Sequence, residues 1–76
     1  MDNQAETDRN DAVRGLFALI TARLEDAHDP SIKGQSEATS KTEMLALLDQ
    51  IASCRGEIAT LEKAIKLLLA RESSAR

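Results

Sequence analysis

The strongest pattern in the chain is an apolar stripe between residues 44 and 68. Apolar side chains recur there at alternating intervals of three and four residues, without a polar interruption: Met44, Leu47, Ile51, Cys54, Ile58, Leu61, Ile65 and Leu68. These intervals place side chains on one face of an α-helix, and a heptad repeat is typical of helices that bury that face against other helices. The stripe therefore predicts a long helix that packs along its whole length.

A capping signal predicts where this helix begins. Ser40 is followed three residues later by Glu43, a pair whose side chains can each bond to the other's backbone N–H. No proline follows. The helix is therefore predicted over residues 41–71, a length of roughly 46 Å at 1.5 Å per residue. Residues 73–76 are expected to form a frayed tail.

A shorter helix is predicted over residues 9–28. Its apolar side chains fall on one face at helical spacing: Val13, Leu16, Phe17, Ile20, Leu24 and Ala27. Pro30 disfavours helical geometry at the residue before it, which predicts the end of this helix. Residues 1–8 are polar and acidic and are interpreted as a disordered lead-in, and residues 29–40 as a linker.

These elements predict an all-α fold: one domain over residues 9–72, built as a two-helix antiparallel hairpin with a longer second helix. The first helix would span only roughly 30 Å and would leave the carboxy-terminal end of the stripe uncovered. Ile65, Leu68 and Leu69 are therefore expected to be exposed, and an exposed apolar patch indicates an interface.

The residues beside the stripe predict how a second copy would pack. A parallel pair of stripes would set Glu57 against Glu62, whereas an antiparallel pair sets Arg55 opposite Glu62 and Leu48 opposite Leu69. We therefore expect an antiparallel homodimer that forms a four-helix bundle, or a specific protein partner on the same surface. The predicted interface comprises Leu47, Leu48, Ile51, Cys54, Arg55, Ile58, Leu61, Glu62, Ile65, Leu68 and Leu69.

Length and composition strengthen the expectation of a partner. A chain of 76 residues buries only a small core, and such domains usually need a disulfide, a metal or oligomerisation. A single cysteine excludes an intrachain disulfide. The net charge of −3 gives no long-range attraction to nucleic acid or to an anionic membrane. A cytoplasmic protein is expected, because the acidic start is unlike a signal peptide and the apolar runs are too short to span a bilayer.

The chemistry-bearing residues are isolated from one another. His28, the only histidine, lies at the predicted end of a helix, where a cation suits the helix dipole. A histidine beside Asp29 could also be a phospho-acceptor, as in phosphotransfer modules, but the surrounding residues do not match a histidine-kinase phosphorylation box. Cys54 lies in the apolar stripe and is expected to pack as a small apolar residue. Without a motif of catalytic or ligand spacing, we expect no enzyme, metal, cofactor or small-molecule substrate.

Three functions are consistent with these patterns. The preferred one is a small protein–protein interaction module (adaptor, chaperone or regulatory subunit) that acts by helix packing through the stripe. The second is an inhibitor of the phage anti-defence type, since residues 1–38 carry eight acids and four bases. Such an inhibitor would block a nucleic-acid-binding protein surface with an acidic face of Asp8, Asp11, Glu25, Asp26 and Asp29. The third is a purely structural, self-assembling helical module.

Overall fold

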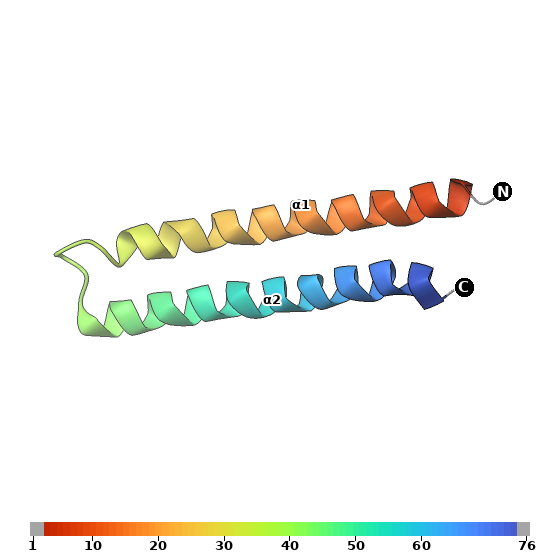
Figure 1. Ribbon diagram of the computed structural model, residues 1–76. Coiled ribbons are helices and arrows are strands. Elements are labelled where there is room, and N and C mark those ends of the chain that lie inside the picture. The colour runs from red at the N-terminus through yellow and green to blue at the C-terminus, as the bar shows by residue number, and fades with distance from the viewer. Residues whose placement is uncertain (1–2, 75–76) are drawn as a thin grey trace.

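The computed structural model describes residues 3–74, which form two helices and no strand. α1 spans Asn3–Lys33 and α2 spans Lys41–Ser74. The helices run antiparallel and pack side by side, with the connecting segment at one end of the molecule (Figure 1). The prediction of an all-α helical hairpin is confirmed.

α2 begins where the capping signal predicts. The backbone N–H of Ser40 donates to Glu43 Oε1 at 2.9 Å, and the backbone N–H of Glu43 donates to Ser40 Oγ at 3.1 Å. Because the carboxylate accepts this backbone hydrogen bond, the pKa of Glu43 lies below its ordinary value. The helix continues to Ser74, beyond the predicted end at residue 71. Residues 75 and 76 of the predicted tail lie outside the described residues.

α1 is longer than predicted at both ends, so the predicted bounds of 9–28 are wrong. It begins at Asn3, and contacts between successive turns support this start. Gln4 Nε2 donates to Asp8 Oδ1 at 3.0 Å, and Arg9 Nη2 lies 3.8 Å from Glu6 Oε2. Pairs at these spacings stabilise a helix even where it buries little apolar surface. Residues 1 and 2 of the predicted lead-in lie outside the described residues.

α1 also continues through Pro30, which the sequence suggested would stop it. Proline lacks the backbone N–H that would bond to the Asp26 carbonyl, but the helix ends at Lys33, so the disruption is confined to its last turn. The Pro30 side chain is buried, and its carbonyl accepts from the Gly34 N–H at 3.0 Å. The Lys33 carbonyl, which accepts no hydrogen bond within the helix, accepts from Thr39 Oγ1 at 2.8 Å and from the Ser36 N–H at 3.2 Å.

The longer α1 covers the apolar stripe of α2 from Leu47 to Leu68, whereas Met44, at its amino-terminal end, stays exposed. The segment between the two helices is only residues 34–40, and the helices have 31 and 34 residues. The expected exposure of the carboxy-terminal end of the stripe is therefore wrong for two of its three residues. Ile65 is 6% exposed and Leu68 is half-buried, whereas Leu69 is 45% exposed.

The core is a single layer of side chains between the helices. α1 contributes residues at alternating intervals of three and four: Val13, Leu16, Ile20, Arg23, Ala27 and Pro30. No described side chain is fully buried. The radius of gyration is 17.7 Å, whereas a compact domain of this length has about 11 Å. The hairpin is therefore a thin rod of 60 × 17 × 11 Å, open to solvent on both sides of its core.

Candidate interaction surface

The thin core leaves large apolar side chains on the surface. Nine of those described are 41% or more exposed: Phe17, Leu19, Leu24, Ile32, Met44, Leu45, Leu48, Leu67 and Leu69. Single exposed apolar residues are ordinary in soluble proteins, but a group of them on one face indicates an interaction site. Their distribution around the rod therefore decides where a partner would bind.

Four of these residues lie on one side of the seam between the helices. This side, termed the Phe17 face, consists of Phe17 and Leu24 on α1 and Leu48, Arg55, Glu62 and Leu69 on α2. Successive members of each helix are seven residues apart, a spacing that keeps them on one side of the helix. The two helices meet on this face at a hollow lined by Phe17, Ile20, Glu62, Ile65 and Lys66.

The exposure of Phe17 and Leu24 corrects the sequence analysis, which placed both on the buried face of α1. They are 55% and 57% exposed. Two helices alone bury a narrow seam, and in α1 Leu16 and Arg23 occupy the seam positions next to them. Phe17 and Leu24 are consequently left at the rim. A wider assembly is needed to cover apolar side chains at such positions.

The other side of the seam, termed the Arg23 face, is organised by charge. Arg23 Nη2 lies 2.9 Å from Asp26 Oδ2, and its Nη1 lies 3.4 Å from Glu57 Oε1. The guanidinium thus joins α1 to α2, although its Nε is buried without a hydrogen-bond partner. This face also has a hollow, lined by Leu19, Arg23, Glu57, Thr60 and Leu61.

The charged side chains of the Phe17 face form no such ion pairs within the described residues. Arg55 and Glu62 are both exposed. Within residues 3–74 neither side chain takes part in an ion pair or a hydrogen bond to another side chain. They lie between Leu48 and Leu69 in the series of seven-residue intervals on α2. Both charges are therefore free to pair with a second molecule.

The structure divides the predicted interface residues into two groups. Seven residues of the stripe lie half-buried or buried toward α1: Leu47, Ile51, Cys54, Ile58, Leu61, Ile65 and Leu68. The other four, Leu48, Arg55, Glu62 and Leu69, are exposed at the rim. These four are the predicted interface residues most accessible to another chain while the hairpin stays closed. Phe17 and Leu24 belong with these four exposed residues. The seven-residue interval between the two is the sequence signal that would have identified them as part of the same surface.

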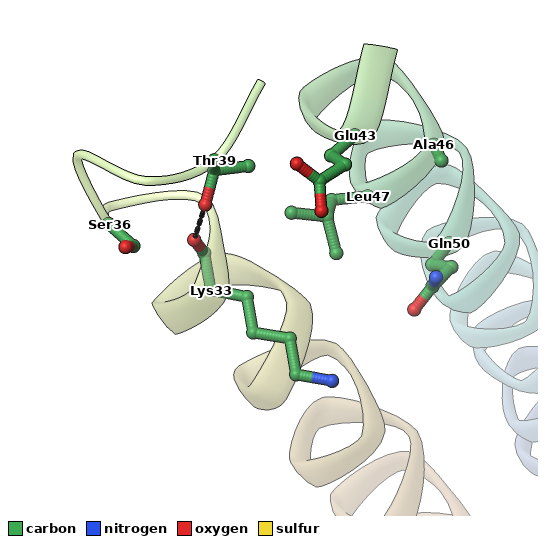
Figure 2. Close-up of a pocket in the computed structure, with 7 residues that line it drawn as sticks. All are labelled: Lys33, Ser36, Thr39, Glu43, Ala46, Leu47 and Gln50. Carbon is green, nitrogen blue, oxygen red and sulfur yellow. Dashed lines mark hydrogen bonds between the residues drawn. The ribbon is translucent and has the colours of Figure 1, made fainter. Parts of the chain in front are cut away.

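A third hollow lies at the connecting end of the hairpin (Figure 2). Its lining comprises Lys33, Ser36, Thr39, Glu43, Ala46, Leu47 and Gln50. The Thr39 hydroxyl bonds to the Lys33 carbonyl across its edge, and the Glu43 carboxylate belongs to the cap of α2. These polar groups close the hairpin and fix the start of the second helix.

The remaining titratable side chains are dispersed over the rod. His28 is exposed, with Nδ1 3.9 Å from Asp29 Oδ1. In the expected acidic face, Arg14 Nη1 lies 3.1 Å from Asp11 Oδ1, and the Asp26 carboxylate forms an ion pair with Arg23. Over residues 3–74, no group of three or more His, Cys, Asp or Glu side chains has an arrangement that could hold a metal ion. Neither described helix has an apolar stretch that would allow it to cross a membrane.

Comparisons with protein-family models, with curated proteins and with solved structures give no match for this chain.

Proposed function

We propose that this chain is a small, non-enzymatic protein–protein interaction module that acts by helix packing, as an adaptor, chaperone or regulatory subunit. In this proposal two hairpins associate antiparallel into a four-helix bundle. The exposed residues beside the stripe make the contact, because most residues of the stripe itself already pack against α1. Assembly would complete a core that one hairpin leaves open.

The observation that carries the proposal is the imbalance between core and surface. None of the described side chains is fully buried, while nine large apolar ones are exposed. Full burial of one leucine-sized side chain contributes about 2 kcal/mol. The four apolar side chains of the Phe17 face are about half exposed, so covering them adds roughly 4 kcal/mol for each hairpin, a large fraction of the stability of a small domain. A rod with this distribution of apolar side chains gains the most stability by packing a second apolar surface against its own.

An acidic inhibitor of a nucleic-acid-binding protein is the less favoured alternative. Its predicted face includes Asp11 and Asp26, and each of these carboxylates lies within ion-pair distance of an arginine of the same helix. The face is thereby partly neutralised. A purely structural, self-assembling module uses the same helix packing as the favoured proposal and differs from it only in having no foreign partner.

Sedimentation equilibrium at micromolar concentration, at low and at high salt, tests the proposal. We expect about twice the chain mass of 8.3 kDa, with little weakening by salt, because apolar burial dominates the contact. A fully helical monomer throughout this range would overturn the self-association. Binding to a foreign protein that weakens steeply with salt would instead favour the acidic inhibitor.

A further inference from the structure

The Phe17 face is self-complementary along α2. The point midway between Leu48 and Leu69 falls between residues 58 and 59, and Arg55 and Glu62 share the same midpoint. A second α2 laid antiparallel about this point sets each leucine against the other leucine, and each arginine against the glutamate. A face that matches itself about one centre has the property of a twofold-symmetric interface.

α1 provides an independent check on this centre. Arg23 contacts Glu57, and Gly34 lies beside the Leu47 side chain, so the level of residues 58 and 59 corresponds to about residue 22 of α1. The midpoint between Phe17 and Leu24 falls between residues 20 and 21. The two centres therefore agree to within about two residues, or roughly 3 Å along the helix. The axis that pairs the α2 residues also brings Phe17 to within about three residues, or roughly 4.5 Å along the helix, of Leu24 of a second copy.

We propose that the Phe17 face binds the Phe17 face of a second copy, about a twofold axis that crosses the rod between residues 58 and 59. This inference rests on the proposed function and specifies its partner, face and register. α2 lies antiparallel on the second α2, α1 lies on the second α1, and the two connecting segments are at opposite ends. Each dimer contains two Arg55–Glu62 pairs between the chains.

Charge complementarity is what identifies the occupant as a second copy. Arg55 and Glu62 have no ion-pair partner within residues 3–74, and each is the complement of the other about the axis. An unrelated helix would have to reproduce the alternation of leucine, arginine, glutamate and leucine at seven-residue intervals. A second copy carries this alternation in the required order and direction.

Charge reversal tests the register. Arg55→Glu and Glu62→Arg should each weaken the homodimer by about tenfold or more, because each places like charges opposite one another twice. The double variant R55E/E62R should recover the wild-type dissociation constant. When the two single variants are mixed, the heterodimer should predominate, since it restores both opposite-charge pairs. Native mass spectrometry of isotope-labelled chains measures this preference.

Cysteine cross-linking tests the face without relying on stability. In a Cys54→Ala background, a mixture of Leu48→Cys and Leu69→Cys chains should form a covalent dimer, because directly opposed residues allow the short Cα separation that a disulfide needs. Either variant alone should not. Leu45→Cys mixed with Leu67→Cys is the matched control: both residues are exposed leucines on α2 outside the Phe17 face, and this mixture should stay uncross-linked.

The outcomes separate the inference from the proposed function. A dimeric wild type in which the control pair cross-links, or in which mixed charge variants show no heterodimer preference, would overturn the Phe17 face while keeping the helix-packing module. A wild type that is a folded monomer at micromolar concentration would overturn both. Cross-linking confined to the Leu48–Leu69 mixture, together with recovery in the double charge reversal, would establish the face and its register.

Discussion

The two sides of the seam in this hairpin differ in whether their charged side chains form ion pairs within the chain. On the Arg23 face, one guanidinium lies beside carboxylates of both helices, at 2.9 Å and 3.4 Å, so the charges are paired within the chain. On the Phe17 face, Arg55 and Glu62 are exposed between leucines and pair with nothing in residues 3–74. Intrachain pairing on one side helps to set how α1 lies on α2. The other side keeps its apolar surface and its charges available for a second molecule.

The largest expected effect comes from placing a carboxylate on each side in turn. Leu24→Glu and Leu19→Glu change the same residue type in the same helix, at side chains that are 57% and 48% exposed. Leu24→Glu should raise the dimer dissociation constant by about 100-fold, because two carboxylates would be desolvated close to Phe17 of the other chain. Leu19→Glu should change it by less than about threefold. Sedimentation equilibrium measures both constants.

Far-UV circular dichroism provides the control for this pair of variants. The helical content of the two should be equal at concentrations where both are monomeric, because neither side chain belongs to the seam. Equal weakening of the dimer by both substitutions would remove the distinction between the two faces. A larger effect of Leu19→Glu on the dimer dissociation constant would show that the dimer contact lies on the Arg23 face instead.

A smaller effect is expected from neutralising one arginine on each side. Arg23→Gln should lower the free energy of unfolding of the monomer by about 1 kcal/mol, since it breaks the contact with Glu57 in a partly solvated site. Arg55→Gln should leave that free energy within about 0.5 kcal/mol and should instead weaken the dimer a few-fold. Urea titrations below and above the dimer dissociation constant separate the two quantities. Identical behaviour of the two variants would contradict the assigned roles.

Much of the hairpin follows from the sequence because strong local signals agree in α2. The capping box predicts its first turn, and the uninterrupted stripe predicts which of its sides packs against another helix. α1 carries weaker signals. The proline rule is sound for a helix interior, but Pro30 lies close enough to the end to remain in the helix. The predicted carboxy-terminal end of α1 was therefore too early in the chain. A shorter α1 would have left Ile65 and Leu68 uncovered, which is why both were expected to be exposed.

The candidate surface was only partly accessible to sequence reasoning, for a geometrical reason. The apolar residues of α1 fit two overlapping stripes, one through Leu16 and one through Phe17. Both have helical spacing, so periodicity alone cannot state which is buried. Packing decides it, because a hairpin of two helices has room for one narrow seam. Leu48 and Leu69 were recognisable as rim residues in α2, where the seam is unambiguous, and their counterparts in α1 were not.

The smallest expected effect on the dimer lies at the connecting end, away from both faces. Ser40→Ala removes the hydroxyl that accepts from the Glu43 N–H at 3.1 Å and should lower the free energy of unfolding by about 1 kcal/mol. The dimer dissociation constant should not change, because the cap lies outside both faces. A change in that constant would mean that the connecting end takes part in the contact. Thermal unfolding and sedimentation equilibrium of the same sample provide the two measurements.

The cap also predicts how stability depends on acid. The hydrogen bond from the Ser40 backbone holds the pKa of Glu43 below its ordinary value of 4.5 in the folded chain, so the ionised form favours folding. Its contribution is complete above about pH 4.5 and is lost as the pH falls through the lowered pKa. Glu43→Gln keeps a side chain that can accept the same bond but does not titrate. Its unfolding free energy should therefore fall less than that of the wild type between pH 5 and pH 3, and parallel curves would show that the cap is not responsible.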